Sequence, residues 1–376
     1  MTMLINQLLR AMGGNSAPSF ANIAPSSFSL WSAALARGAA SPARHAVNGD
    51  SNLSGEGAGG GALGFDGAAL LGIPDQIALL AGHRHESIFG DQNVTTATSV
   101  ATWDTRVTLG TGWAADAAPS TFGGRFYVAP AASAGTMTFA PSEQWDTAVI
   151  WYPKVSTAAT ALEIYVDGVL NTTINQTGAN LFGSTTISTT LGTHTIGFKN
   201  GTTGQAFVQG VEFRNSTSAT PTTLKGGWCA IRFTSLNDTS AAWKNRSSLV
   251  ALAPDFITVY CSINDIRDGL AVATYQSQVD QYVLAMRTQA NGCLVLGYPP
   301  NHANWPTLGE SYATALKTVA TSRGWGFYDS RNVFGADNAA AAAKGYRFDD
   351  SHPSLAGHQA FAAGYVSQLR TWGMSI

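Results

Sequence analysis

Three polar residues in two short segments carry the groups that a nucleophilic hydrolase requires. Ser51 follows a Gly-Asp pair, and near the C-terminus Asp349 stands three residues before His352. In such a set the hydroxyl attacks a carbonyl carbon, the imidazole accepts its proton, and the carboxylate holds the imidazole in the productive tautomer. Either segment alone is commoner as an ordinary turn or a surface feature, and Asp350 is a rival orienter for the imidazole. Their occurrence in one chain favours the catalytic interpretation.

A third segment can supply a further group to the same chemistry. Residues 262–265 read Ser-Ile-Asn-Asp directly after an apolar run, so the amide of Asn264 can donate a hydrogen bond to a developing oxyanion. The neighbouring Asp265 is better interpreted as a residue that fixes this loop. Asn52, beside the candidate nucleophile, either shapes the turn or lines an acyl pocket.

Short apolar runs, each ending at a turn or at one of these residues, predict the strands that position them. They are residues 45–48, 229–234, 255–261, 293–298 and 325–329. Helical spacing separates the later runs, and the last helix has an apolar stripe from Phe361 to Trp372 with Ser354 as its N-cap. Alternating strands and helices predict a parallel sheet with helices on both faces and sites at the carboxyl ends of the strands. Ser51, Asn264 and the loop of His352 follow such ends.

The three segments resemble the signature blocks of the SGNH (GDSL-type) hydrolases. Residues 49–52 read GDSN, residues 262–265 stand where the family usually has GxND, and residues 349–352 fit DxxH. The resemblance covers roughly residues 45–60 and 220–376. It implies a three-layer α/β/α sandwich with a short parallel sheet, and esterase or deacetylase activity without a metal or cofactor. By this resemblance Ser51 is the nucleophile, His352 the base, Asp349 its orienter and Asn264 an oxyanion donor.

Two departures from the family pattern concern the oxyanion hole. Ser262 replaces a family glycine, and we expect this small residue to be tolerated. The family's second block offers a glycine whose backbone N–H joins the oxyanion hole, and no clean match exists here. The best-placed stretch is 234–239, which puts a donor near Asn237 beside the N–H of Ser51 and the amide of Asn264.

The middle of the chain has a different pattern. Apolar and polar residues alternate over 162–167, and Asp167-Gly168 then predicts a tight hairpin turn, a signal that Asn200-Gly201 repeats. No convincing helix is expected here. We predict that residues 99–217 form an antiparallel β-sandwich, similar to jelly-roll carbohydrate-binding modules, inserted into a hydrolase domain made of residues 45–98 and 218–376.

Composition favours polysaccharide-facing or extracellular-type proteins. Charged residues make up 12% of the 376 residues, about half of the ~25% usual in soluble proteins, and ten tryptophans are present. The tryptophans of the middle region can either stack on sugar rings or pack in a core; they are Trp103, Trp113, Trp145 and Trp151.

Several classes of protein and site are not expected. The net charge of −2, without a basic cluster, argues against nucleic acid binding, and no apolar run of about 18 residues predicts a membrane span. Three widely spaced cysteines at 229, 261 and 293 are predicted to be buried free thiols. The His83–Glu86 stretch has the spacing of a metal motif but no evident third ligand, so no metal or cofactor is expected.

The sequence leads to one predicted function and two alternatives. We predict a serine esterase that hydrolyses O-acyl esters, most simply O-acetyl esters, on a polysaccharide through an acyl-enzyme. The alternatives are a general short-chain esterase or lipase, and a non-catalytic glycan-binding virion or structural protein. Residues 1–44, rich in Ala, Ser and Gly, read as a linker or assembly segment without a recognisable signal peptide. We therefore expect an extracellular or virion-associated protein, with a cytoplasmic one still open, and homo-oligomers or virion tail components as possible partners.

Overall fold

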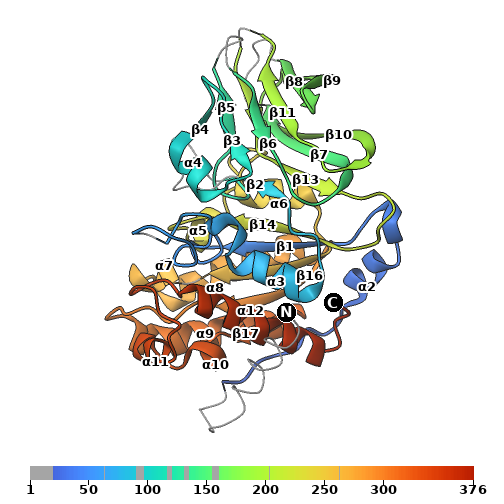
Figure 1. Cartoon of the computed structure of the whole chain (residues 1–376). Coiled ribbons are helices and arrows are strands. Elements are labelled where there is room, and N and C mark those ends of the chain that lie inside the picture. Colours follow the sequence, from blue (N-terminus) through green and yellow to red (C-terminus); the bar gives the residue numbers. More distant parts are fainter. Residues whose placement is uncertain are drawn as a thin grey trace.

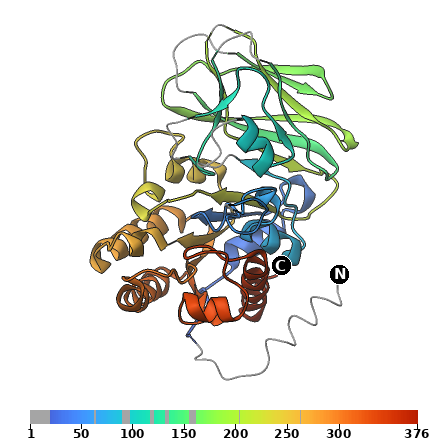
Figure 2. The same cartoon turned by 60° about the vertical axis from the view of Figure 1, so that its left-hand side comes forward.

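The computed structural model describes residues 20–62, 64–89, 97–116, 121–130, 135–154, 161–202, 204–261 and 263–376. Figures 1 and 2 show a body of helices around one sheet, with a group of antiparallel strands at the other end of the molecule. Residues 1–19 lie outside the described residues. So does Ser262, the residue expected to be tolerated in place of a family glycine.

The body is built on a parallel sheet of five strands. Its order is β14-β1-β15-β16-β17, and all neighbouring strands run parallel. The strands are β1 Arg44–Gly49, β14 Thr222–Gly227, β15 Phe256–Cys261, β16 Asn291–Leu296 and β17 Gly326–Asp329. This confirms the predicted parallel sheet and the runs near 45, 255, 293 and 325.

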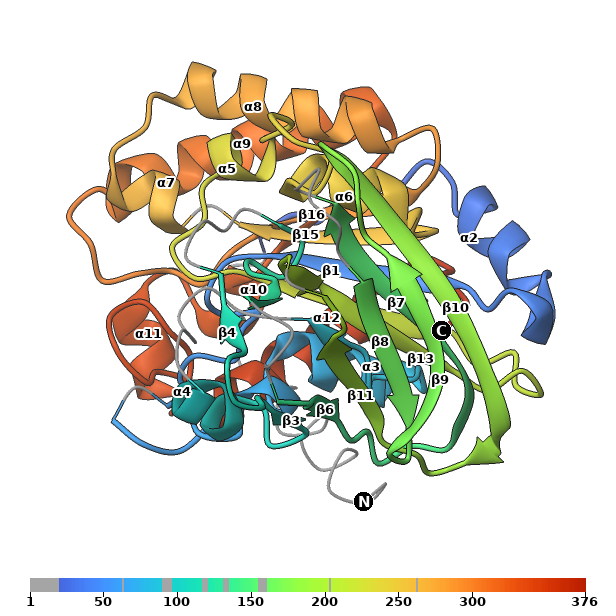
Figure 3. The same ribbon diagram turned by 90° about the horizontal axis from the view of Figure 1, so that it is seen from above.

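Helices cover both faces of this sheet. Seen from above, α8 (Val272–Met286) and α9 (Trp305–Arg323) lie on one side, and α3 (Ile73–Ala81) and α12 (Leu355–Thr371) on the other (Figure 3). A separate hydrophobic core lies on each face of the sheet, and successive strand residues point into opposite cores. Ala46 and its neighbour Val47, for example, belong to different cores. The α/β/α class is therefore confirmed. The remaining helical elements are α2 Ser29–Leu35, η1 Gly38–Ala40, η2 Ala68–Leu70, α4 Ala97–Trp103, α5 Phe233–Leu236, α6 Asn245–Leu252, α7 Ile263–Arg267, α10 Arg331–Phe334 and α11 Asn338–Ala343.

One predicted strand is wrong. The apolar run at 229–234 leads into α5, and the strand of this region is the preceding stretch, Thr222–Gly227. That stretch looks polar in the sequence, but its threonines are buried, and Lys225 forms an ion pair with the buried Asp75 of α3. A buried ion pair is a tertiary contact that hydropathy does not reveal.

Gly49 lies where β1 and β15 approach most closely. A Cβ atom added at this position would stand 1.7 Å from the backbone oxygen of Tyr260, which belongs to the neighbouring strand and cannot swing away. We expect Gly49→Ala to lower the free energy of unfolding by at least about 3 kcal/mol, the upper end for overpacked cores. Urea denaturation measures this change. Gly60→Ala is the control, because its nearest contact would be an acceptable 3.4 Å, and comparable stability of the two variants would contradict the prediction.

The chain between β1 and β14 builds three antiparallel sheets. Their orders are β10-β7-β13-β2, β3-β6-β11-β8-β9 and β12-β5-β4. The strands are β2 Ile88–Phe89, β3 Val107–Thr108, β4 Ala114–Ala115, β5 Tyr127–Ala129, β6 Met137–Phe139, β7 Trp145–Lys154, β8 Ala161–Val166, β9 Val169–Asn175, β10 Leu181–Gly192, β11 Ile196–Asn200, β12 Ala206–Val208 and β13 Gly210–Arg214. Helix α4 enters the region that we expected to lack helices.

The two predicted hairpin turns have different outcomes. Asp167 and Gly168 have φ angles of +51° and +80°, and they join the paired strands β8 and β9, as predicted. The expectation for Asn200-Gly201 is wrong, because β11 pairs with β6 and β8, whereas the next strand, β12, pairs with β5. The Asn200 amide instead donates to the backbone oxygens of Ala129 and Gly204.

Aromatic and sulfur side chains of the sequence analysis are mostly interior. All four tryptophans singled out in the middle region are at most 7% exposed, so the core interpretation is confirmed for them and sugar stacking is wrong. Cys229 and Cys293 are buried free thiols, as predicted. Residues 20–44 pack on the body, since Ile23 bridges to Phe327 and Trp31 is fully buried. None of the helices in the described part of the chain combines the length and hydropathy required to cross a membrane.

Candidate active site

Three neighbouring strands end beside the candidate nucleophile. In the sheet register Gly49, the last residue of β1, pairs with Gly227, the last residue of β14, and with Tyr260 near the end of β15. Ser51 follows two residues after β1, and Asn264 lies in the first turn of α7, directly after β15. The parallel arrangement thus places these residues at one edge of the sheet, although more than 200 positions separate them.

The structure brings Ser51, His352 and Asp349 into one hydrogen-bonded series. The Ser51 Oγ lies 2.8 Å from Nε2 of His352, and Nδ1 of the same ring lies 2.9 Å from Oδ2 of Asp349. Ser51 is 5% exposed, so the hydroxyl is largely shielded from water. A hydroxyl, an imidazole and a carboxylate in this order can activate the oxygen for attack on a carbonyl carbon.

The loop before α12 fixes the base and its orienter. Oδ1 of Asp349 accepts hydrogen bonds from the backbone N–H groups of Ser351 (2.7 Å) and His352 (2.8 Å). Ser354 caps α12 through its side chain, which accepts from the N–H of Gly357, as predicted. Asp350, the rival orienter, forms an ion pair with Arg347 at 2.7 Å instead. The geometry therefore leaves Asp349 as the carboxylate at the ring.

A second carboxylate, which the sequence analysis missed, contacts the same imidazole. Oε2 of Glu56 lies 3.2 Å from Nε2 of His352. Glu56 stands five residues after Ser51 in a glycine-rich stretch, and no spacing rule singles it out. Only the close packing of this stretch against the loop before α12 brings it to the site; a Cβ on Gly57 would stand 2.3 Å from the backbone oxygen of Pro353.

Both carboxylates alter the titration of the imidazole. Burial alone would lower the pKa of His352, but hydrogen bonds with Asp349 and Glu56 outweigh it and raise the pKa to about 9. Burial tends to raise the pKa of Asp349, yet hydrogen bonds from His352 and Ser351 lower it, so this group stays charged at neutral pH. Because the base needs an unprotonated Nε2, activity is expected to decline as the pH falls below about 9.

The turn after β1 is held by the residue before the nucleophile. Oδ1 of Asp50 accepts from the backbone N–H of Asn52 (3.1 Å) and from its side-chain amide (3.0 Å). Asp50 is fully buried, and this burial raises its pKa to about 7 despite those bonds. Asn52 therefore shapes the turn, one of the two roles considered for it.

The two predicted oxyanion asparagines have different surroundings. Nδ2 of Asn264 donates to the backbone oxygen of Ile231 at 2.9 Å, and since an amide carries two hydrogens, one remains for another acceptor. The structure does not bring the Asn237 side chain to Ser51. Its Nδ2 donates to the backbone oxygen of Gln278 at 2.6 Å, and its Oδ1 accepts from Arg246.

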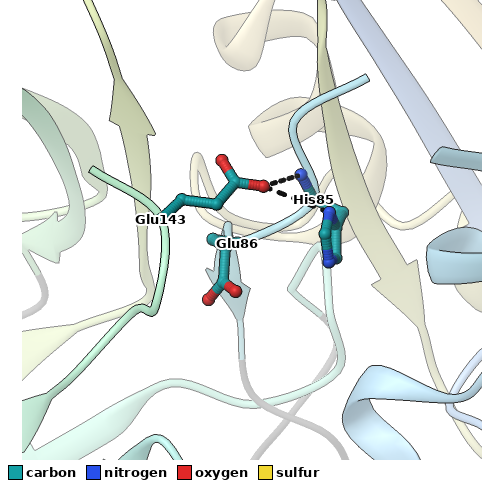
Figure 4. Close-up of side chains that lie close together, drawn as sticks. All are labelled: His85, Glu86 and Glu143. Carbon is teal, nitrogen blue, oxygen red and sulfur yellow. Dashed lines mark hydrogen bonds and ion pairs between the residues drawn. The ribbon is translucent and has the colours of Figure 1, made fainter. Parts of the chain in front are cut away.

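Two residues of the histidine-rich stretch at 83–86, His85 and Glu86, form a cluster with Glu143. Figure 4 shows His85, Glu86 and Glu143 close together, with the Glu143 carboxylate directed at His85. Glu143 also pairs with Arg84 at 3.0 Å, and Glu86 pairs with Arg106 at 3.0 Å. A cation would have to displace these arginines, so we interpret the cluster as a link between the segment after α3 and the segment before β7.

Comparisons with known proteins agree with this fold. Residues 222–360 match the profile of the GDSL-like lipase/acylhydrolase family. No curated protein sequence matches the chain significantly. Among solved structures, a peptidoglycan O-acetylesterase is 16% identical with a TM-score of 0.65, over 91% of this chain and 94% of that one. At this level of identity, the similarity shows a shared fold.

Two further solved structures resemble the chain less closely. An acetylxylan esterase from Geobacillus stearothermophilus is 18% identical with a TM-score of 0.33, over 42% of this chain and 74% of that one. A family two carbohydrate esterase from Clostridium thermocellum is 12% identical with a TM-score of 0.33, over 71% of this chain and 99% of that one.

The range matched by the family profile contains Asn264, Asp349 and His352 but not Ser51. Strand β1 brings Ser51 to them, because it lies between β14 and β15 of the matched range. Residues 222–360 therefore resemble a GDSL-like lipase/acylhydrolase domain, and the sheet adds to this range the strand that precedes Ser51.

Proposed function

We propose that the protein is a serine esterase that removes O-acyl groups, most simply O-acetyl groups, from a polysaccharide. The observation that carries this proposal is the series from Ser51 Oγ to His352 Nε2 (2.8 Å) and from Nδ1 to Asp349 (2.9 Å). Two of its three residues lie in the range that matches the GDSL-like lipase/acylhydrolase family, and hydrolysis of an ester bond is a reaction that such a series can catalyse.

Acylation begins when the Ser51 oxygen attacks the ester carbonyl carbon. The hydroxyl proton passes to Nε2 of His352, while Asp349 stabilises the imidazolium through Nδ1. The tetrahedral intermediate collapses, the bond to the sugar oxygen breaks, and His352 returns the proton to that oxygen. The products are a free sugar hydroxyl and an acyl group on Ser51.

Deacylation repeats these steps with water. His352 takes a proton from a water molecule whose oxygen attacks the acyl carbon, and the carboxylic acid leaves as the proton returns to the Ser51 oxygen. The ester is thus cleaved by one water molecule, and the enzyme ends in its starting state.

We propose three donors for the oxyanion: the N–H of Ser51, the amide of Asn264 and the N–H of Ala230. Ala230 takes the role first predicted for a donor near Asn237. It lies three residues after β14, and its φ of +59° is in the left-handed region that glycine prefers. The adjacent Cys229 contacts Glu56, which in turn contacts His352, so this turn lies beside the triad.

Asn264→Ala is expected to lower kcat by about 100- to 1000-fold, the usual effect of removing one oxyanion donor. KM should change little, because the amide bonds mainly to the negative charge of the transition state. Steady-state hydrolysis of 4-nitrophenyl acetate measures the change. Asn215→Ala, which removes an exposed amide in a turn after β13, is the control. An unchanged kcat in Asn264→Ala would contradict the assignment.

Two observations support an acetylated polysaccharide as substrate. One solved structure with a similar fold is a peptidoglycan O-acetylesterase, and the chain as a whole is poor in charged residues. The depression beside the base, lined by Arg347 to His352, is open, as a polymer substrate requires. We also propose that residues 99–217 form a separate unit that contacts the glycan, and that the protein works outside the cell or on a virion.

Acetate release from purified polysaccharides tests the substrate class. We expect release from O-acetylated bacterial polysaccharides by the wild type but not by Ser51→Ala, and little hydrolysis of long-chain lipid esters. Preference for long-chain esters would favour a lipase. Polysaccharide binding without any acetate release would favour a non-catalytic binding protein.

A further inference from the structure

Nε2 of His352 faces two oxygen atoms rather than one. Ser51 Oγ lies at 2.8 Å and Oε2 of Glu56 at 3.2 Å from this nitrogen. The Glu56 side chain is 13% exposed, whereas that of Asp349 is 44% exposed. The carboxylate that the proposed mechanism does not use is therefore the more deeply buried of the two at the ring, where its charge is less screened.

Several contacts hold Glu56 in this position. Its backbone N–H donates to the backbone oxygen of Ser51 at 3.2 Å. Its backbone oxygen lies 3.1 Å from Nε2 of His358, a fully buried residue of α12. Burial lowers the pKa of His358 to about 4, so this ring is neutral at pH 7 and donates through Nε2–H. The thiol of Cys229 reaches the Glu56 carboxylate at 3.7 Å.

The two protonation states of Nε2 respond to Glu56 in opposite ways. A protonated Nε2 donates its hydrogen to the Ser51 oxygen and the Glu56 carboxylate together, which stabilises the imidazolium. An unprotonated Nε2 accepts the Ser51 hydrogen, and its lone pair then faces a negatively charged oxygen. Only the second state can begin catalysis. Glu56 therefore favours the resting form of the base over the active one.

We propose that Glu56 is a pH-dependent brake on this site, which competes with Ser51 for Nε2 of His352 and holds the base protonated until the pH rises. The proposal deepens the proposed esterase function and rests on it. Glu56 thus regulates the triad from outside it and forms no covalent bond with the substrate.

The other titratable or charged groups near the imidazole act elsewhere than at Nε2, and Asp349, which also favours the protonated ring, does so from the opposite side. Asp349 bonds to the opposite nitrogen, Nδ1, and Arg347 and Asp350 pair with each other. Asp50 lies beneath the nucleophile with its Oδ1 bonded to Asn52. The titratable groups that interact with His352 are Glu56 and Asp50 from the segment after β1, Asp349 from its own loop and His358 from α12. Cys229 contacts Glu56 rather than the ring.

Glu56→Gln tests the proposal, because it removes the charge but keeps the shape and the backbone contacts. We expect the acidic limb of the pH profile of kcat/KM for 4-nitrophenyl acetate to move about 1–3 pH units lower, the usual effect of one opposite charge at this distance. At a pH below both midpoints, the variant should be at least about tenfold faster than the wild type. Asp167→Asn is the control, because it breaks a similar histidine–carboxylate contact, with His194 at 2.7 Å, in the β8–β9 turn region.

Coinciding midpoints for the wild type and Glu56→Gln would overturn the proposal. A uniformly lower rate with an unchanged midpoint would also overturn it, because that is the result of a purely structural role. Titration of the His352 ring by NMR, assigned with His352→Gln, gives a second readout that needs no turnover. Should neither protein hydrolyse the ester, the esterase proposal fails, while a lower midpoint for His352 in Glu56→Gln would still support the brake.

Discussion

Ser51→Ala is expected to lower kcat for 4-nitrophenyl acetate by about a million-fold, as the loss of a triad nucleophile does in well-studied hydrolases. Alanine has no oxygen to attack the carbonyl, so no acyl-enzyme can form. Mass spectrometry after mixing with the ester should show an acyl adduct on the wild type and none on the variant. Stopped-flow absorbance should show a burst of 4-nitrophenol for the wild type alone.

The control for this change is Ser311→Ala, which removes an exposed hydroxyl on α9 that bonds to the backbone oxygen of Thr307. It should keep full activity. Thermal denaturation should show that Ser51→Ala is folded, since the substitution removes a hydroxyl that bonds to a side chain, His352, and leaves the backbone bonds of the turn in place. If a folded Ser51→Ala protein kept a tenth of the wild-type rate, the nucleophile would have to be another residue.

The second large effect is expected for Asp349→Asn, which should lower kcat by about 10⁴-fold. An amide at this position can still accept the backbone N–H groups of Ser351 and His352 through its oxygen. Its NH₂ group, however, cannot accept from Nδ1, so the ring would adopt the wrong tautomer and lose its charged partner. The pH profile of kcat/KM should also move lower, because Asp349 helps to raise the pKa of His352.

Asp350→Asn is a closely matched control, because it makes the same change at the adjacent residue. The Asp350 carboxylate pairs with Arg347 and accepts from the amide of Asn301, whereas the ring of His352 bonds to Asp349. Its kcat should stay within about threefold of the wild type, as expected for an exposed ion pair of small energy. A larger loss in Asp350→Asn than in Asp349→Asn would exchange the roles of the two residues.

Local patterns in the sequence were enough to predict most of the parallel sheet and the proximity of Ser51, His352 and Asp349. Apolar runs and helical spacing depend on neighbouring residues, and the register of parallel strands then places their ends together. The hairpin at Asp167-Gly168 could be predicted for the same reason, since φ > 0 at both positions is a local requirement.

The features that were missed depend on tertiary contacts. Strand β14 looked too polar because it contains Lys225, whose charge is paired with the buried Asp75, about 150 positions away. Asn200 was predicted to be a turn residue, but its amide donates to the backbone oxygen of Ala129 in β5. Glu56 approaches His352 only after the two loops have packed together, and no periodicity in the sequence encodes that contact.

The position of β1 between β14 and β15 also has a consequence for biosynthesis. The ribosome makes Ser51 before both neighbours of its strand, which emerge more than 170 residues later, and His352 follows still further on. Pairing over such sequence distances is entropically costly and slow. The nascent chain therefore has to carry β1 without its neighbours while more than 170 further residues are made, and it acquires His352 only when α12 is about to appear.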